Sequence, residues 1–397
     1  MTVRDDAAAI AGDIIGLRHA IHAEPEIGLY LPKTQQKVLV ALDGLPLEIT
    51  TGKQLTSVIA VLRGGRPGRT VLLRGDMDAL PVAEATGLPF ASQIDGAMHA
   101  CGHDLHTAML AGAARLLSAR QAEIAGNVIF MFQPGEEGYA GARQMINEGV
   151  LDATAERPMA AFAIHVSSGE PCGVFSTRPG PMLAAADTIT VTLRGRGGHA
   201  ALPHGALDPI PATAEIVTAL QTMVTRRFDV FDPVVVTVST MHAGTTHNVI
   251  PDEARFGAIA RSYSAASRER LRKETLRLVA DIARGHGLAA DAEYTEGYPA
   301  TLNNAAEAAF AAATAAEVFG AERALPAEHP VTASEDFSFV LEQVPGAFVR
   351  LGARPPGTDQ ETAPSNHSAS AVFDDTALAD GTAMYAELAL RRLATAA

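Results

Sequence analysis

Three short, continuously apolar stretches constrain the fold of this chain more than any other feature. They lie at 70–74, 127–132 and 159–164, and each is predicted to be a buried β-strand. Predicted helices at about 104–120 and 139–149 separate them. Strands without a polar face that alternate with helices are typical of a mostly parallel sheet covered on both sides. The sequence therefore predicts an α/β fold for this part of the chain.

Acidic or imidazole side chains follow each of these strands. Asp76 and Asp78 come after the first strand, the adjacent Glu136 and Glu137 after the second, and His165 after the third. Functional groups of parallel sheets gather beyond the carboxyl ends of the strands. We therefore expect these side chains to meet in one composite site.

A second group of chemically active residues lies between the first two strands, in Met-His-Ala-Cys-Gly-His-Asp-Leu-His at 98–106. Cys101 and His103 are two residues apart, and such side chains point the same way in extended chain. Thiolate and imidazole are good ligands for zinc-like metals. A buried cysteine beside residues that cap a helix is the alternative interpretation of this stretch.

The adjacent carboxylates of Glu136 and Glu137 also indicate a metal. One of them would be held protonated unless a cation neutralised the pair. With a metal present, one carboxylate is a ligand and the other can act on a bound water. The candidate set is large enough for two ions: Asp76, Asp78, Cys101, His103, His106, Glu136, Glu137, His165 and His367.

The ligand types alone leave the reaction open. Hydrolysis of an amide, with Glu136 as general base, and hydrolysis of a phosphoester both suit a two-metal site. A nucleophilic Cys101 with His103 as its base also remains possible. The sequence contains no Gly-x-Ser-x-Gly elbow, no P-loop and no His-Glu-x-x-His motif.

The pattern of the chain changes near Pro181. Polar and apolar residues alternate at 188–193, which is typical of a sheet with one face in solvent. The pattern of the first part resumes near residue 297. A chain of 397 residues also exceeds the roughly 250–300 at which a single core stops growing. We expect a catalytic domain at 1–182 and 297–397, with an α+β domain inserted at 183–296.

Composition excludes some partners. The formal net charge is −14, from 31 basic and 45 acidic residues, and no basic cluster occurs. This argues against nucleic acid or an anionic membrane as a partner. The N-terminus lacks the pattern of a signal peptide, and no run of 18 apolar residues could span a bilayer. We expect a cytoplasmic protein with reduced cysteines.

Together, these motifs resemble one known family. It is the cocatalytic-metal aminoacylase and carboxypeptidase family, in the amidohydrolase branch with hippurate hydrolases, N-acyl-amino-acid amidohydrolases and plant auxin-conjugate hydrolases. The matching stretches cover nearly the whole chain in order: 74–81 (RGDMDALP), 98–106 (MHACGHDLH), 133–138 (QPGEEG), 164–166 (IHV) and 366–367 (NH). The resemblance implies a zinc-peptidase-like α/β catalytic domain with an inserted α+β lid domain that also mediates dimerisation.

The resemblance also implies roles for residues. Two divalent metals, zinc, manganese, cobalt or nickel, would be held by Cys101, His103, Glu137, His165 and His367. Glu136 matches the general base, and Asp78 matches the acid that orients a metal ligand. The wider family usually has a metal-binding histidine at the position of Asp76 and a bridging aspartate at that of Cys101, so the bridging ligand is an open question.

In the inserted domain, the resemblance points to three further residues. His199 would polarise the scissile carbonyl, often from the partner subunit of a dimer. Asn248 and Arg261 resemble residues that hold the carboxylate of the substrate's amino acid, for which an arginine fork is well suited. Without the family, they would be interpreted as a turn histidine, a turn asparagine and a surface arginine. The stretch 334–337 (SEDF) also resembles a family motif, but we assign it no step in the reaction.

The sequence thus predicts a two-metal hydrolase of N-acyl-amino acids that releases a carboxylic acid and a free amino acid, and that forms a homodimer through the lid. Three alternatives remain. One is a deacetylase of the N-acetyl-diaminopimelate type, and another is a dipeptidase that needs a free amino terminus. The third is a catalytically silent binding protein on the same fold.

Overall fold

A computed structural model describes residues 2–395, and these residues divide into two compact units. The first unit takes in the chain up to Met182, together with Leu302–His329 and the residues from Asp336 onwards. The second unit consists of Leu183–Thr301 and Pro330–Glu335. No helix among the described residues is long and apolar enough to cross a membrane.

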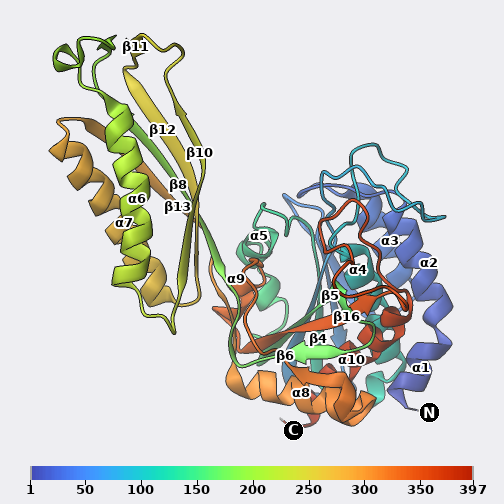
Figure 1. Ribbon diagram of the computed structural model, residues 1–397. Coiled ribbons are helices and arrows are strands. Elements are labelled where there is room, and N and C mark those ends of the chain that lie inside the picture. The colour runs from blue at the N-terminus through green and yellow to red at the C-terminus, as the bar shows by residue number, and fades with distance from the viewer. Residues whose placement is uncertain (1, 396–397) are drawn as a thin grey trace. The chain divides into compact units, whose positions relative to one another are not determined.

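An eight-stranded mixed sheet forms the centre of the first unit (Figure 1). In spatial order its strands are β1 (Leu47–Thr51), β2 (Val58–Arg63), β4 (Ala125–Gln133), β3 (Arg66–Asp76), β5 (Ala160–Pro171), β16 (Gly346–Arg354), β6 (Phe175–Thr177) and β15 (Ala324–Pro326). The central strands β4, β3, β5 and β16 are parallel to one another. Antiparallel pairs join β1, β2 and β4 at one edge. The predicted α/β class is confirmed.

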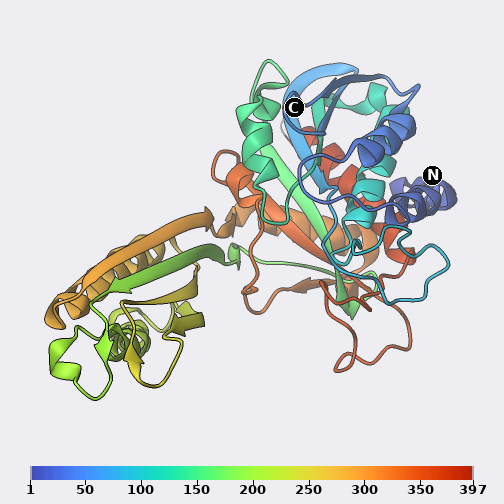
Figure 2. The same ribbon diagram turned by 90° about the horizontal axis from the view of Figure 1, so that it is seen from above.

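Helices pack on both faces of this sheet (Figures 1 and 2). In chain order they are α1 (Val3–Ala9), α2 (Ala11–His22), α3 (Pro32–Leu42), α4 (His103–Ala119), α5 (Gly141–Asn147), α8 (Ala305–Phe319), α9 (Ser338–Leu341) and α10 (Thr376–Ala394). Helices α4 and α10 lie against β3 and β5, with α1 and α2 packed outside them, and α5 packs on α9 and β4.

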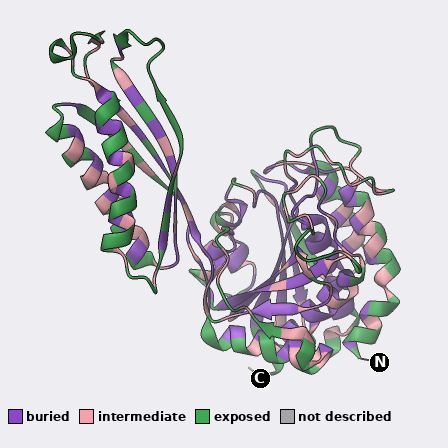
Figure 3. Cartoon of the chain, in the orientation of Figure 1, coloured by how far each residue is buried: buried purple, intermediate pink, exposed green. Residues whose placement is uncertain are grey.

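Adjacent side chains of the central strands are buried on opposite faces. Leu73 and Phe130 join one core cluster with Leu105 of α4, whereas their neighbours Leu72 and Ile129 are fully buried although they point the other way. Burying a side chain of this size contributes about 1.5–3 kcal/mol. The continuous apolar runs in the sequence therefore reflect two covered faces, as Figure 3 shows by the uniformly buried strands.

Strand β5 continues further than the apolar run predicts. The run ends at Ile164, but the strand extends through His165 to Pro171. The cause is β16, which comes almost 200 residues later in the chain and pairs in parallel with β5 beyond Ile164, with Arg350 beside His165. Pairing with a distant strand is not visible in the local pattern. His165 is therefore held within the sheet rather than in a loop after it.

The second unit has a four-stranded antiparallel sheet. Its strands in spatial order are β10 (Val234–Ala243), β12 (Glu253–Ser262), β8 (Ala185–Arg194) and β13 (Ala289–Tyr298). Two helices, α6 (Pro209–Arg227) and α7 (Ala265–Gly285), pack on one face (Figure 1). Burial alternates along β8, which confirms the expected sheet with one face in solvent.

The remaining strands and 3₁₀ turns are short. They are β9 (Gly198–His199) paired with β11 (Val249–Ile250), β7 (Gly180–Leu183) paired with β14 (Thr301–Asn303), and short 3₁₀ turns at Gln121–Glu123, Val150–Asp152, Pro203–Gly205 and Ala321–Arg323. Helix α6 begins as its sequence indicates. Asp208 caps it by accepting a hydrogen bond from the Ile210 N–H at 3.0 Å, and proline occupies its first position.

Candidate metal centre

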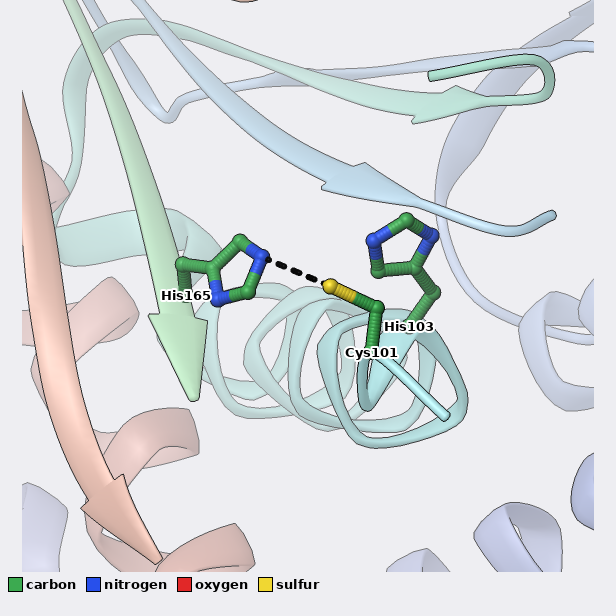
Figure 4. A group of neighbouring side chains, drawn as sticks. All are labelled: Cys101, His103 and His165. Atoms are coloured by element: carbon green, nitrogen blue, oxygen red, sulfur yellow. Dashed lines mark hydrogen bonds between the residues drawn. The ribbon is translucent and has the colours of Figure 1, made fainter. Parts of the chain in front are cut away.

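Cys101, His103 and His165 lie together where β5 approaches the start of α4 (Figure 4). Cys101 stands in the turn before α4, and His103 is the first residue of that helix. The Cys101 Sγ is 3.5 Å from the His165 Nε2. One possible ligand atom from each residue lies within 4.8 Å of the others, which is a separation that a single metal ion can bridge.

Gly102 makes this arrangement possible. Its φ is +82°, a left-handed conformation that favours glycine, and it directly precedes α4. A Cβ at this position would lie 2.3 Å from the Cγ2 of Val166, in the strand that carries His165. The glycine therefore allows the turn between Cys101 and His103 to approach β5 closely.

A methyl group at this position is expected to disturb both the turn and the strand. The left-handed conformation alone costs an L-residue about 1–2 kcal/mol, and the Val166 side chain must also move. We expect Gly102→Ala to lower the free energy of unfolding by at least about 1–2 kcal/mol, measured by urea denaturation. Gly44→Ala is a control for the backbone term, because Gly44 has φ +75° but nothing within 4 Å of its added Cβ. Equal losses in the two variants would contradict the close-approach argument.

Asp78 connects the turn of His103 to the turn of the two glutamates. Its backbone carbonyl accepts a hydrogen bond from the His103 Nδ1 at 2.8 Å. Its carboxylate accepts from the backbone N–H groups of Glu136 (2.9 Å) and Glu137 (3.0 Å). The remaining nitrogen of His103, Nε2, is buried and has no hydrogen-bond partner among the described residues. A metal ion is the natural partner for such a nitrogen.

His367 brings a loop near the end of the chain to the same place. Its Nε2 lies 3.3 Å from the Cys101 Sγ and 3.2 Å from the Glu137 Oε1. Its φ of +72° is unusual for a residue other than glycine, and its N–H donates to the Ala100 carbonyl at 2.8 Å. The backbone contact holds the ring beside Cys101 although the side chain is about half exposed.

The five predicted ligands form overlapping groups. Ligand atoms of Cys101, Glu137 and His367 lie within 4.8 Å of one another, as do those of Cys101, His103 and His165. Cys101 belongs to both groups, which is the arrangement that a thiolate between two ions requires. A third group joins His103 to Glu136 and Glu137. The structure thus brings the five predicted metal ligands and Glu136 together.

The electrostatics of the group also fit bound cations. The Cys101 and Glu137 side chains raise the pKa of His367 to about 10. Burial opposes the charge on His103, but Asp76 and Cys101 outweigh it and raise its pKa well above the usual value. Without a cation, the acidic ligands therefore draw protons onto histidines. One thiolate, three imidazoles and a carboxylate suit two divalent ions that accept a soft ligand.

Two residues of the candidate set, Asp76 and His106, take a different part. The Asp76 carboxylate accepts from the Arg74 Nη1 at 2.6 Å and from the His106 Nδ1 at 2.5 Å. The other nitrogen of His106 accepts from the Val166 N–H at 2.8 Å. Both nitrogens of His106 are therefore engaged by protein groups, and burial lowers the pKa of this ring. Asp76 and His106 therefore hydrogen-bond to neighbouring protein groups rather than join the five predicted ligands.

Asn366, which has no role of its own in the sequence pattern, connects the His367 loop to the rest of the site. Its Nδ2 donates to the carbonyls of Cys101 (3.3 Å) and Val166 (3.1 Å), and its Oδ1 accepts from the Ser168 N–H at 3.0 Å. It thereby ties the His367 loop to β5 at Val166 and Ser168. The only signal in the sequence is its position beside His367 in the Asn-His pair at 366–367.

His199, Asn248 and Arg261 all lie in the second unit. His199 in β9 and Asn248 just before β11 are exposed neighbours, since the Ala200 N–H donates to the Asn248 carbonyl at 3.1 Å. Arg261 lies near the other end of β12, eight residues beyond its first residue, Glu253. At the usual rise of a strand that span is roughly 27 Å. Within one unit, the structure brings the first two residues together and keeps the third apart.

Comparison with known proteins identifies the family. Residues 72–391 match the model of peptidase family M20/M25/M40. The chain belongs to this family. It is 36% identical over 383 residues to an N-acetylcysteine deacetylase of Bacillus subtilis, covering 96% of this chain and 97% of that protein. It is also 36% identical over 393 residues to thermostable carboxypeptidase 1 of Saccharolobus solfataricus, covering 98% of each.

A solved structure of the same family supports the fold. The dinuclear metal-binding M20 peptidase of Bacillus subtilis superimposes with a TM-score of 0.84 at 33% identity, over 98% of this chain and 99% of the other. The family inferred from the motifs is confirmed. With it, the prediction of an enzyme, a metal-dependent amidohydrolase, is confirmed as well.

Proposed function

We propose that this protein is a cytoplasmic N-acyl-amino-acid amidohydrolase that uses two divalent metal ions and releases a carboxylic acid and a free amino acid. The observation that carries the proposal is the pair of ligand groups that share Cys101 and lie beside the Glu136–Glu137 turn. A site with this donor set suits zinc, manganese, cobalt or nickel.

Glu136 is the proposed general base. When bound, the metals lower the pKa of a coordinated water towards ~7. Glu136 is 6% exposed, and its backbone is fixed by the Asp78 carboxylate. Its carboxylate takes a proton from the attacking water and later delivers it to the leaving nitrogen. Water thus adds across the amide bond, with the hydroxyl on the acyl carbon and hydrogen on the nitrogen.

We propose a catalytic domain at 1–182 and 297–397 and a lid at 183–296, which correspond to the first and second units except that 297–301 and 330–335 belong to the second unit. In the lid, Arg261 is the proposed partner of the substrate carboxylate. Its Nη1 is buried without a hydrogen-bond partner among the described residues, and burial lowers its pKa. An anionic group would accept a hydrogen bond from this nitrogen and would favour the charged form of the guanidinium. A guanidinium fork binds a carboxylate through two parallel hydrogen bonds.

The separation within the lid supports a homodimer. His199 and Asn248 lie at the β9–β11 pair, which leads into the first residue of β12, Glu253, whereas Arg261 lies eight residues further along β12, a span of roughly 27 Å. One small substrate is too short to contact all three residues across such a span. We propose that the partner subunit supplies His199, which polarises the scissile carbonyl, and Asn248, which helps to hold the substrate carboxylate.

The names of the relatives point to two classes of substrate for this site. The deacetylase name favours a short acyl group, and the carboxypeptidase name favours a peptide or acyl-peptide. The deacetylase of N-acetyl-diaminopimelate and the dipeptidase remain the alternatives. Family membership with an assembled ligand set weighs against a catalytically silent binding protein.

A substrate panel tests the proposal. N-acetyl-, N-benzoyl- and indoleacetyl-amino acids, N-acetyl-diaminopimelate and a free dipeptide are compared by release of amino acid. We expect kcat/KM for the best N-acyl-amino acid to exceed that for the dipeptide by at least about tenfold, which corresponds to 1.4 kcal/mol. A dipeptide that is hydrolysed faster than every acylated substrate would refute the proposed substrate class.

A further inference from the structure

His106 is a buried ligand-type residue that the proposed mechanism does not use. Its side chain is fully buried, and it lies three residues after His103 on α4. The Nε2 accepts the Val166 N–H at 2.8 Å, so this nitrogen carries no proton. The Nδ1 therefore bears the hydrogen and donates it to Asp76 at 2.5 Å. Asp76 is itself held by Arg74, which fixes the direction of the ring.

The strand geometry explains why Val166 needs this acceptor. Pairing between β3 and β5 ends at Arg74 and Ala163. Beyond Ala163, the edge of β5 that faced β3 pairs with no other strand of the described chain, although β16 still pairs on the other edge. A buried N–H without an acceptor would cost about 1–3 kcal/mol. His106 supplies that acceptor at the point where the strand enters the metal centre.

The backbone of Val166 in turn fixes the ring of His165. The Val166 carbonyl accepts from the His165 Nδ1 at 2.8 Å and from the Asn366 Nδ2 at 3.1 Å. With Nδ1 engaged, His165 presents its Nε2 towards the Cys101 Sγ, 3.5 Å away (Figure 4). A shift of Val166 would therefore turn a proposed ligand away from Cys101.

We propose that His106 is a positioning residue of the metal centre, which holds the Val166 backbone and thereby the metal-facing ring of His165, and which does not itself bind metal. This inference rests on the proposed metal centre and adds a residue to it. Residues that orient metal ligands in this way contribute a factor of about 10–100 to metal affinity.

Two variants separate the two hydrogen bonds of His106. In His106→Gln, the amide oxygen takes the place of Nε2 and can still accept the Val166 N–H. In His106→Asn, the amide nitrogen takes the place of Nδ1 and can still donate to Asp76, but Val166 loses its acceptor. Full-length protein is stripped with a chelator and titrated with Co²⁺, followed by the absorption of thiolate-bound cobalt and by calorimetry.

We expect His106→Asn to bind one of two Co²⁺ ions about 10–100-fold more weakly, and His106→Gln to stay within about threefold of the unmodified protein. His22→Asn is the matched control. His22 is also a buried histidine, but its ring nitrogens contact the carboxylates of Asp104 (2.7 Å) and Glu84 (3.3 Å), neither of which is a proposed ligand. It should lose stability and keep its Co²⁺ affinity.

Unchanged affinity in His106→Asn, or equal weakening in the Asn and Gln variants, would overturn the positioning role. Complete loss of one ion in both variants would show that His106 is itself a ligand, which also overturns it. Failure of the unmodified protein to take up Co²⁺ would instead overturn the proposed metal centre, so the two failures are distinguishable.

Discussion

Replacing Glu136 with glutamine is expected to lower kcat for an N-acyl-amino acid by about 10²–10⁴-fold while both metals stay bound. The amide keeps the size and hydrogen-bonding shape of the carboxylate but cannot accept a proton from water. The backbone N–H of residue 136 still donates to Asp78, so the turn is retained. Steady-state kinetics and metal analysis of the same sample measure the two parts of the prediction.

Glu137→Gln is the matched control, because it makes the same chemical change one residue further along. Glu137 faces His367 at 3.2 Å and shares a ligand group with Cys101. Its loss should lower the metal content or affinity first and activity as a consequence. If Glu136→Gln lost metal or kept its turnover, the two glutamates would have been assigned the wrong roles.

Arg74→Met is expected to give the largest loss of stability, about 3–5 kcal/mol. Arg74 is 2% exposed, and it donates to Asp76 (2.6 Å), Asp336 (2.9 Å) and the Gln133 side chain (2.8 Å). Burial favours a neutral Asp76, but Arg74 and His103 outweigh burial and hold its pKa well below the usual range. Without the guanidinium, the buried carboxylates of Asp76 and Asp336 lose their positively charged partner. Urea denaturation measures the resulting loss in the free energy of unfolding.

Arg63→Met provides the comparison for an exposed pair. Arg63 and its partner Glu48 have side chains that are 42% and 63% exposed. Such pairs contribute about 0–1 kcal/mol. Similar losses at Arg74 and Arg63 would show that the buried network around Asp76 and Asp336 is not a major source of stability.

Part of the candidate site could be predicted from the sequence because Asp78, Glu137 and His165 each come after an apolar run that forms a buried strand. An acid or histidine after a strand in a parallel sheet is placed at the same edge as its counterparts, wherever it lies in the chain. Glu137 and His165 meet Cys101 for this reason. His367 follows no such rule, and only the resemblance of the Asn-His motif pointed to it.

The division of work among these residues could not be predicted from the sequence. His103 and His106 have the same side chain, and both lie in the first turn of α4. They differ because the Val166 N–H donates to the Nε2 of His106, whereas the Nε2 of His103 has no hydrogen-bond partner among residues 2–395 and lies 3.6 Å from the Asp76 carboxylate. That N–H is available only because β3 stops pairing with β5 at Ala163.

Asp336 shows the same limit. The motif at 334–337 that contains it resembles a family motif, but the sequence assigns it no step in the reaction. In the structure, its carboxylate accepts hydrogen bonds from the Arg74 and Gln133 side chains and from the Ala142 N–H at 2.9 Å. These partners lie in β3, β4 and α5, which are 262, 203 and 194 residues from Asp336 in the chain. A local pattern carries no information on such contacts, which depend on the completed sheet.

Restoration of the metal-free protein tests the central claim most directly. The full-length protein is stripped with a chelator, its residual metal is measured, and turnover of the best N-acyl-amino acid is followed as Zn²⁺, Mn²⁺ or Co²⁺ is added. We predict negligible turnover without metal and a rise that reaches its plateau at two equivalents per chain. Full activity in a sample shown to contain no metal would contradict the account.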